Sequence, residues 1–485
     1  MKFSDTVLLT ALLILISIKT FATVIDVPTD YPTIQQAIDA AGNGDTVLVS
    51  PDRYYENINF KGKNILVTSH YIFNNDIDFI SNTIIDGSQP SHPDTASCVL
   101  IISGEDSSAT LQGFTLTGGT GTKWIDEHGA GTYFEGGGIL VTLSSPTIRN
   151  NLIIENEAIR TEAGVTSAGG GGIRVGDGNP HILNNVIMSN SGMYGGGIVL
   201  NYTGAVIRNN IIYNNQVFQA VTGAPTFGGG GIWILSNLGS TPKIIENNTI
   251  LGNTSSGTGS GAAGKGGGIL VWATTFEGKN NIIWGNIQTL GNQIEQLGGG
   301  AANLFYNLVE GGWPGTGNID VNPNFEETNF YLSDSSACID AGDPGPAYND
   351  PEGDPGMGKW PAKGTIRNDI GAYGGPFSAE LGEFIISSVS NDGDGSFFSR
   401  YKLEQNYPNP FNPGTNIRFQ IADRGFVTLK VFDVLGSEIT TLINKELPAG
   451  EYEFDFDGKE LSTGIYYYQL SVGNFRESKK MVLIK

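Results

Sequence analysis

The sequence of 485 residues is poor in cysteine, histidine and positive charge. Two cysteines and four histidines are too few for a zinc cluster or a disulfide-rich scaffold. Lys and Arg number 27 against 49 Asp and Glu, a net charge of −22, which argues against a nucleic-acid partner. Because Cys98 and Cys338 lie far apart in the chain, we expect two separate buried thiols.

Charged residues of either sign are also scarce, at 16 % of the chain, while hydrophobic residues reach 39 %. This balance excludes a disordered chain and a helical bundle or coiled coil. Glycine is abundant instead, with 69 residues, about twice the ordinary share. Much glycine and little charge indicate many short strands joined by tight turns, and therefore an all-β protein.

Only one long apolar run is present, from Val7 to Ile18, and it follows Lys2. The run is too short to span a bilayer, Lys19 interrupts it, and small residues precede a cleavage position after Ala22. We therefore predict a cleaved signal peptide over 1–22 and no integral membrane segment in the mature protein. A membrane anchor is the alternative.

The middle of the chain is a repeat. Gly-Gly-Gly-Ile occurs at 136–139, 170–173, 195–198, 229–232 and 266–269, with a shortest period of 25 residues. Each copy precedes an Asn-Asn pair, which begins at Asn150, Asn184, Asn209, Asn247 and Asn280. An Ile follows three residues later, and another Asn three residues after that, at Asn156, Asn190, Asn215, Asn253 and Asn286.

A period near 25 with strand-like segments predicts a right-handed parallel β-helix over 23–302. The repeated Ile are expected to stack inside it, and the Asn to occupy corners, where they tolerate left-handed backbone and pass hydrogen bonds between coils. The triple Gly fits a tight corner. The segment YPTIQQAIDAA (31–41) has helical apolar spacing, with Thr33 as the N-cap, and predicts a helix that caps the open end. Early strands are expected at 46–49, 65–68, 83–85 and 114–117.

The string VPTDYPTIQQAIDAAGNGDTVLVSPDRYYENINFKGKNILVTS, followed by TIIDG and LQGFTLTGG, resembles secreted proteins of the pectin-lyase-like β-helix superfamily. The resemblance implies that lyases of that superfamily combine clustered Ca²⁺-binding Asp with a basic residue, that its hydrolases use several neighbouring Asp, and that its esterases use two Asp and an Arg. We find none of these constellations at matching positions, which leaves enzymatic activity undecided.

From 303 to 376 the period is lost, and Asp, Pro and Gly accumulate. We predict a C-terminal cap of the β-helix there, followed by a polar linker over 377–400. Acidic residues of the cap could hold structural Ca²⁺ or simply form an acidic loop. They are Asp340, Asp343, Asp350, Glu352, Asp354 and Asp369.

Residues 401–485 alternate apolar and polar side chains in short runs, which predicts a small β-sandwich. Here YKLEQNYPNPFNPGTNIRF, LPAGEY, LSTGIYYYQL and KKMVLIK resemble the type A sorting domain of type IX secretion. The resemblance implies export through the periplasm, recognition of 401–485 by the secretion machinery, and release or anchoring at the cell surface. The sorting segment has 10 basic and 11 acidic residues, whereas 23–400 has 15 and 37, so the acidity belongs to the exported part.

Segments of variable length precede the triple Gly of the repeats: 118–135, 157–169, 216–228 and 254–265 are long insertions, whereas 191–194 is minimal. Such insertions build the binding face of many solenoids. Two outward columns join them as candidates. The first column carries Tyr213 and Trp284, and it is either a platform for sugar rings or a face that loops cover. The second column stacks Arg149, Arg208 and Lys279, and it either supplies the base of a lyase or forms a solvated edge.

The predicted substrate-binding residues are Trp124, Tyr133, Tyr194, Tyr213, Phe218, Phe227 and Trp284. The candidate catalytic residues are Asp126, Glu127, His128, Arg149, Arg160, Glu162 and Arg208. Three functions stay open: binding of polysaccharide or surface adhesion, cleavage of an extracellular polysaccharide as a lyase or hydrolase, and a purely structural surface role. Ca²⁺ is the one cofactor the sequence suggests, because an acidic surface needs it to approach a polyuronate.

Overall fold

The computed structural model describes residues 22–382, except 237–240 and 327–328. It also describes 402–484, except 404–405, 407, 422–424, 435–436, 448–449, 460 and 473–474. Residues 1–21 of the predicted signal peptide and 383–400 of the predicted linker lie outside the described residues. None of the described helices is long and apolar enough to cross a bilayer.

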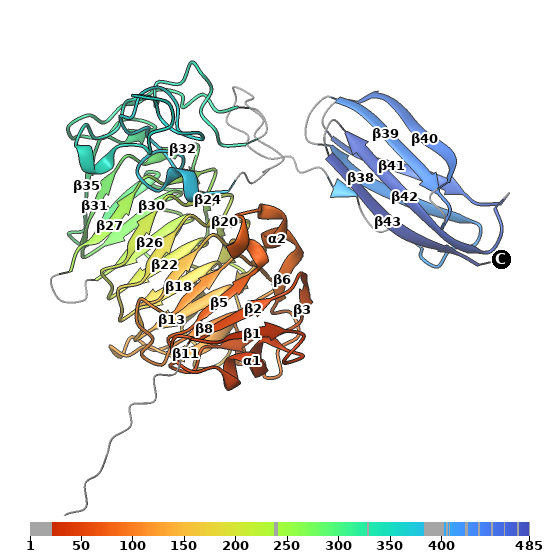
Figure 1. Cartoon of the computed structure of the whole chain (residues 1–485), viewed down its shortest axis with the longest axis horizontal. Helices are drawn as coiled ribbons and strands as arrows, with labels where there is room; N and C mark the ends of the chain where they lie inside the picture. The colour runs from red at the N-terminus through yellow and green to blue at the C-terminus, as the bar shows by residue number, and fades with distance from the viewer. Residues whose placement is uncertain are drawn as a thin grey trace, which may run out of the picture.

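Three long parallel sheets wind the first part of the chain into a right-handed β-helix, with strands stacked from β1 at one end to β35 at the other (Figure 1). Sheet 1 holds β1 (Val24–Val27), β2 (Thr46–Val49), β5 (Leu66–Ser69), β9 (Thr110–Gln112), β14 (Thr147–Arg149), β19 (His181–Leu183), β23 (Val206–Arg208), β27 (Lys243–Glu246), β31 (Thr275–Lys279) and β35 (Ala301–Phe305). Sheet 2 holds β3 (Asp52–Tyr54), β6 (Thr83–Asp86), β10 (Thr115–Thr117), β15 (Leu152–Ile154), β20 (Val186–Met188), β24 (Ile211–Tyr213), β28 (Thr249–Leu251), β32 (Ile282–Trp284) and β36 (Leu308–Val309). Sheet 3 holds β4 (Ile58–Asn59), β8 (Val99–Ile101), β13 (Ile139–Thr142), β18 (Ile173–Gly176), β22 (Ile198–Asn201), β26 (Ile232–Leu235), β30 (Ile269–Trp272) and β34 (Ile294–Leu297).

Two smaller sheets come from the insertions. The corner sheet holds β16 (Glu157–Ala158), β21 (Ser191–Gly192), β25 (Gln216–Val217), β29 (Thr254–Ser255) and β33 (Ile287–Gln288). The hairpin sheet holds β7 (Thr95–Ala96), β11 (Gly121–Ile125), β12 (Thr132–Glu135) and β17 (Ser167–Gly169). Because β11 and β12 are antiparallel neighbours, insertion 118–135 is an ordered hairpin that crosses the outer face of sheet 3.

The core of the solenoid contains the predicted aliphatic ladders. Ile139, Ile173 and Ile198 lie opposite one another on adjacent strands, and every repeat Ile is fully buried in one continuous cluster. Strand alternation explains this, because one residue in two points inward.

The predicted Asn corners are confirmed, and the two residues of each Asn pair have different structural roles. The first Asn of every pair has a left-handed backbone, with φ between 51° and 56°. The second forms a ladder in which Asn151 Nδ2 donates to Asn185 Oδ1 at 3.1 Å, and so on to Asn307. A parallel ladder runs from Asn156 to Asn286 with links of 2.9–3.0 Å.

The triple Gly forms the corner that leads into sheet 3. Its first residue is left-handed, with φ of 66° at Gly170. The other two make room for the neighbouring coil, since a Cβ at Gly172 would lie 2.6 Å from the carbonyl oxygen of Gly197. Only glycine meets both demands.

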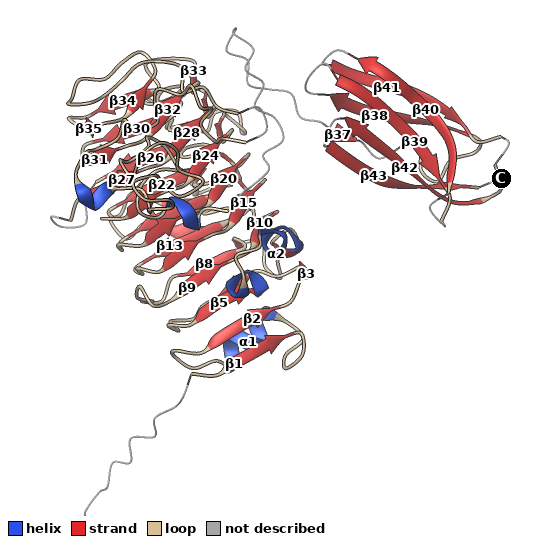
Figure 2. Ribbon diagram, turned by 45° about the horizontal axis from the view of Figure 1, so that its top comes forward, coloured by secondary structure: helices blue, strands red, loops and turns tan. Residues whose placement is uncertain are grey.

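The predicted capping helix is α1 (Ile34–Ala40), where Thr33 Oγ1 accepts from the backbone N–H of Gln36 at 3.2 Å. Ile34, Ala37 and Ile38 are fully buried and extend the solenoid core. Two more short helical segments, η1 (His70–Phe73) and α2 (Ile77–Asn82), lie in an early coil. The helices are few and short beside the strands (Figure 2).

After β36 the chain turns back along the solenoid. We call residues 329–382 the strap; it contains η2 (Pro346–Tyr348) and η3 (Ser378–Glu380). The strap runs toward the N-terminal coils, so the predicted cap lies along the side of the β-helix as well as at its end. Ser378 and Leu381, at the start of the predicted linker, are buried.

The C-terminal segment forms two antiparallel sheets, as its alternating pattern predicts (Figure 2). One holds β37 (Lys402–Leu403), β38 (Gly414–Ile421) and β41 (Gly450–Asp457). The other holds β39 (Gly425–Phe432), β40 (Glu438–Leu447), β42 (Gly464–Val472) and β43 (Phe475–Leu483). Apolar side chains of both sheets share a core of their own. Cys98 and Cys338, in the solenoid part, are buried free thiols, as expected.

Candidate functional site

The strap engages the first Asn of all five pairs. Asn280 Oδ1 accepts from Asp343 N at 2.7 Å, and Asn209 Nδ2 donates to the carbonyl oxygens of Ala372 and Gly374 at 2.9 and 2.7 Å. The remaining pairs meet the strap through Asn247 to Asn368, Asn184 to Phe377, and Asn150 to Glu380. The strap therefore forms hydrogen bonds with the side chain of the first Asn of every pair, which the left-handed backbone of the corner turns outward.

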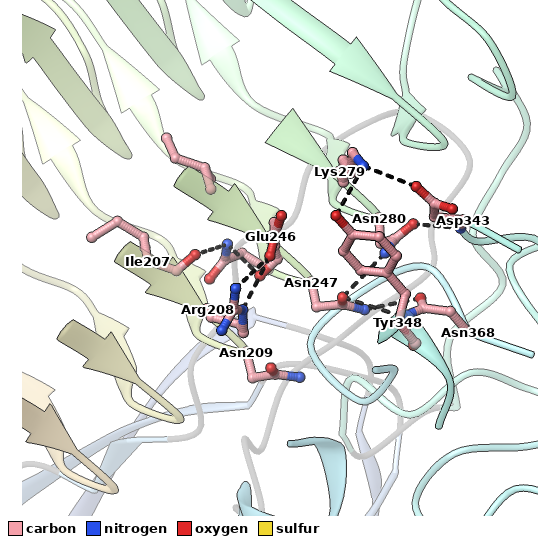
Figure 3. A network of polar contacts seen from close by, with 12 residues as sticks. Ile207, Arg208, Asn209, Glu246, Asn247, Lys279, Asn280, Asp343, Tyr348 and Asn368 are labelled. Carbon is pink, nitrogen blue, oxygen red and sulfur yellow. Dashed lines mark hydrogen bonds and ion pairs between the residues drawn. The ribbon is translucent and has the colours of Figure 1, made fainter. Parts of the chain in front are cut away.

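Of the stacked basic residues, Arg208 and Lys279 lie on the same covered edge (Figure 3), and Arg149 stands in the same column of sheet 1. Arg208 pairs with Glu246 at 2.6 Å, and Arg149 with Glu380 at 2.6 Å. Lys279 contacts Asp343 at 3.0 Å and the hydroxyl of Tyr348 at 2.9 Å. Burial lowers the pKa of Lys279, but these two bonds outweigh it and hold the pKa above its ordinary value. A lysine that stays charged is no general base, so this column anchors the strap.

The aromatic column of sheet 2 is covered as well. Tyr213 is buried and meets Phe330 of the strap edge-on at 5.0 Å, and Trp284 packs in the same cluster. Tyr213 and Trp284 therefore lie under a covering segment, as one of the two predictions for this column has it, and do not form an open platform for sugar.

The outer face of sheet 3 is different, because it carries a buried cluster of charged groups beneath the β11–β12 hairpin. Arg174, the second residue of β18, is 1 % exposed. Its Nε lies 2.9 Å from Glu135 Oε2, and its Nη2 lies 3.9 Å from Glu127 Oε2. Tyr194 donates its hydroxyl to Glu135 Oε1 at 2.5 Å. One guanidinium thus lies between a buried carboxyl group and an exposed one.

Burial raises the pKa of Glu135, although Arg174 and the Tyr194 hydroxyl act in the opposite direction. Burial also raises the pKa of Tyr194 well above its ordinary value, so its hydroxyl stays protonated and donates. A buried carboxyl group with a raised pKa beside a hydroxyl donor is a type of group that functional sites use.

Two glycines make space for this cluster. A Cβ at Gly176 would lie 2.1 Å from Arg174 Nη1, and a Cβ at Gly169 would lie 2.6 Å from the ring of Tyr194. In sheet 3, Gly176 stands in register with Thr142 and Asn201. It is the position where a missing side chain lets the guanidinium lie flat on the strand.

Several buried polar atoms of this face have no hydrogen-bond partner among the described residues. They are Glu135 Oε2, Arg174 Nε and Nη1, Asp177 Oδ2, Asn201 Oδ1 and Trp233 Nε1. The first two form an ion pair without hydrogen-bond geometry. Unpaired buried polar atoms are rare in folded proteins, so their concentration on one face indicates a place built for polar contacts.

The hairpin turn adds three of the candidate catalytic residues. His128 Nε2 lies 2.8 Å from Asp177 Oδ1, and its ring stacks on Tyr202 at 3.5 Å. Asp126 is buried and accepts from the backbone N–H groups of His128 and Ala130, so it shapes the turn. Glu127 accepts from Trp124 Nε1 at 2.7 Å and from Thr142 Oγ1 at 2.8 Å.

Aromatic rings continue from this cluster along sheet 3. Tyr194 lies edge-on to Tyr133 at 6.1 Å and to Phe227 at 6.0 Å, and contacts Trp233 at 5.2 Å. Tyr133, Phe227 and Trp272 are partly exposed members of this cluster, whereas Tyr194 and Trp233 are buried beneath them. We call Tyr133, Phe227 and Trp272 the ring strip.

Three remaining candidates lie apart from the cluster. Arg160 packs over the ring of Phe134 at 4.3 Å and pairs with Glu162 at 2.8 Å, and Glu162 also pairs with Lys123 at 2.6 Å. These surface pairs fasten the outer side of the hairpin. Phe218 lies outside the ring strip.

The acidic residues of the predicted Ca²⁺ site are distributed along the strap. Asp350 and Asp369 are buried and accept backbone N–H bonds, and Asp343 pairs with Lys279. Asp340 accepts from Thr365, Glu352 from Gly356 N, and Asp354 is exposed. Within the described residues, no group of three or more His, Cys, Asp or Glu side chains is arranged to hold a metal ion.

Comparison with known proteins settles the C-terminal segment. Residues 405–485 match the family described as the secretion system C-terminal sorting domain. The chain carries a type IX sorting domain. Because a sorting domain directs export, the protein leaves the cell or is displayed on its surface. No curated protein sequence matches the chain.

Two solved structures similar to the solenoid are β-helix proteins. A pectin methylesterase in complex with a hexasaccharide is 10 % identical, covering 59 % of this chain and 78 % of its own, with a TM-score of 0.33. A PL6 family alginate lyase is 14 % identical, covering 63 % of this chain and 51 % of its own, with a TM-score of 0.20. Neither likeness bears on what this sorting-domain protein binds.

The sequence analysis missed Arg174, Asp177, Trp233 and Trp272. A signal for Arg174 was present, because the equivalent residues of the other repeats are the apolar Leu140, Val199, Trp233 and Leu270. Arg174 is the one charged residue at this position among the five Gly-Gly-Gly-Ile repeats, although Glu295 continues the column on β34. Asp177 and Trp272 could not be identified from the sequence, because the sequence does not show which strand positions the insertions cover.

Proposed function

We propose that this exported β-helix binds polysaccharide along the outer face of sheet 3, beside the β11–β12 hairpin. The observation that carries the proposal is the adjacency of the ring strip to the cluster of Glu127, Glu135 and Arg174. Sugar rings place apolar faces on aromatic side chains and hydroxyls on charged groups, and this face offers both.

The spacing of the solenoid supports the same proposal. Adjacent coils stack at about 4.8 Å, close to the length of one pyranose unit, and Phe227 and Trp272 come from successive repeats. A glycan chain lying along the solenoid axis would therefore meet one of these rings in each of the two coils, although Trp272 is in register with Leu235 and not with Phe227.

The test is retention of the purified exported protein on insoluble neutral and acidic polysaccharides. Trp272→Ala and Phe227→Ala are each expected to weaken binding about tenfold, the loss of one stacking contact. Trp360→Ala serves as the control, because Trp360 is an exposed tryptophan on the strap. Equal binding by all three variants would contradict the proposal.

Cleavage of the bound glycan is a second candidate, favoured by the raised pKa of Glu135 beside the Tyr194 hydroxyl. The measurement is reducing-end release, and the absorbance of unsaturated uronates, by wild type and Glu135→Gln. Product from wild type alone would support cleavage, whereas retention with no product supports binding only.

A further inference from the structure

The C-terminal end of the solenoid holds a second, separate feature, a polar cavity of about 420 Å³. Its lining includes Asn286, Gln288, Asn292, Gln293, Glu310 and Trp313. This volume falls within the usual range for small-ligand sites. None of these residues belongs to the ring strip or to the Arg174 cluster.

The cavity forms where the Asn ladder stops. Asn286 Nδ2 donates to Gln293 Oε1 at 3.1 Å, so Gln293 takes the position of the next Asn. Gln293 Nε2 then donates to the carbonyl oxygen of Glu310 at 2.7 Å. These bonds fix the amide walls of the cavity.

At this end of the corner sheet, no further described strand follows to donate to its acceptors. Each corner-sheet strand gives a carbonyl to the next coil, as Val217 does to Ser256 N at 2.8 Å and Ser255 to Thr289 N at 3.1 Å. Among the described strands β33 is the last of this sheet, and its equivalent carbonyl belongs to Gln288. The side-chain Oε1 of Gln288 is also buried without a donor in the described part of the chain.

Charge limits what can enter. No Lys or Arg lines the cavity, so an anionic ligand would gain no counter-charge. Glu310 is the one acidic residue in the lining, and its Oε2 already accepts from Gly285 N at 2.8 Å. Open acceptors without cations favour a neutral ligand rich in hydroxyl donors.

Trp313 supplies the apolar surface such a ligand needs. Its Nε1 donates to the carbonyl oxygen of Ala302 at 3.3 Å, and its ring packs against the end of the solenoid core. A fixed indole beside amide groups is suited to the apolar face of a sugar ring.

We propose that this end cavity binds one or two neutral sugar units of a glycan. The site is independent of the face of sheet 3, so it can operate whether or not polysaccharide binds there.

The experiment is calorimetric titration of the full exported chain with cellotetraose, xylotetraose, mannotetraose and laminaritetraose. Trigalacturonate and CaCl₂ are titrated separately. At least one neutral tetrasaccharide is expected to bind, and Gln288→Ala and Trp313→Phe are each expected to weaken that binding about tenfold. Gln216→Ala is the matched control, because Gln216 is an exposed glutamine of the same corner sheet outside the cavity.

Four results would overturn the proposal: no binding by any neutral tetrasaccharide, equal binding of trigalacturonate, heat from CaCl₂ alone that Gln288→Ala removes, or unchanged binding by both cavity variants. Trp272→Ala separates the two sites. If that variant alone abolishes tetrasaccharide binding, the sugar lies on sheet 3 and the cavity proposal fails. If it loses polysaccharide retention but keeps tetrasaccharide binding, both proposals stand.

Discussion

The strap-covered edge of the solenoid and the hairpin-covered face of sheet 3 are built from similar materials. Each carries arginine, carboxylates and large aromatic rings. On the strap side, Arg149, Arg208 and Lys279 all have acidic partners. On sheet 3, Arg174 pairs with Glu135, but Arg174 Nη1, Asp177 Oδ2 and Asn201 Oδ1 are buried without a hydrogen-bond partner in the part of the chain that the structure describes.

The difference separates a docking surface from a candidate binding surface. An edge whose charged groups are all paired within the chain has little charge left for a ligand, although Asn209 Oδ1 and Ser378 Oγ also lack a hydrogen-bond partner among the described residues. A face that holds charges in place through cradling glycines such as Gly176, while leaving their hydrogen-bonding capacity unused, is suited to exchange contacts with something else.

The largest expected effect comes from removing one arginine on each side. Arg174→Met leaves Glu135 buried without its partner and should lower the free energy of unfolding by about 3–5 kcal/mol. Arg208→Met, whose side chain is 26 % exposed, should cost about 1 kcal/mol. Chemical denaturation measures the free energy of unfolding of both variants.

Because burial already raises the pKa of Glu135, the stability lost in Arg174→Met should be smaller at pH 5 than at pH 8. Equal losses in the two variants would erase the contrast between the faces.

A second pair of variants measures how much the hydrogen bonds to the strap contribute to stability. Asn209→Ala removes two hydrogen bonds to the strap and places alanine in a left-handed backbone with φ of 54°. Asn214→Ala imposes the same backbone strain, with φ of 53°, at a residue bonded to Ser189 instead. The first should be less stable than the second by about 1–3 kcal/mol. Matching melting temperatures would mean that the strap contacts contribute nothing.

The strap should also respond to pH. Burial raises the pKa of Asp350 to about 8 and that of Asp369 to about 7, from an ordinary value of 3.8. At a pH between the ordinary and the raised pKa values, the folded protein keeps protons on these two carboxyl groups that the unfolded chain has released. The free energy of unfolding therefore falls as pH rises from about 4 to about 8 and then levels off. We expect the melting temperature to drop by a few degrees from pH 5 to pH 8. Asp350→Asn should flatten that slope, whereas Asp354→Asn, at an exposed position, should retain it.

The smallest effect is expected from Phe218→Ala. Phe218 is a predicted substrate-binding residue that lies outside the ring strip, so its loss should change neither polysaccharide retention nor melting temperature. If Phe218→Ala lost as much polysaccharide retention as Phe227→Ala, the binding surface would extend beyond sheet 3. The difference between the strap-covered edge and the face of sheet 3 would then be smaller.

Much of the fold could be predicted from the sequence because a solenoid repeats its local rules. The Asn pairs, the triple Gly and the repeated Ile each report a constraint within one coil, and five copies make the constraint visible. Thr33 and the apolar spacing after it predicted α1 for the same reason. The C-terminal sandwich followed from strand alternation and from motifs that cover the whole segment.

The candidate site was predicted only in part. The hairpin residues Glu127 and His128 and the rings Tyr133 and Phe227 were named from their place in insertions. The insertions could not reveal that they fold over Arg174, because that contact joins a loop to a strand in another coil. The strap was harder still, since its irregular Asp, Pro and Gly sequence carries no period that shows which coil each residue meets.

The strap also changes how such a solenoid should unfold. A stack in which each coil touches only its neighbours frays from its ends, one repeat at a time. Here one continuous segment joins the coil of Asn280 to the coil of Asn150, so no intermediate coil can open without releasing contacts made by the others. We therefore expect the coils from Asn150 to Asn280 to unfold together as one cooperative unit.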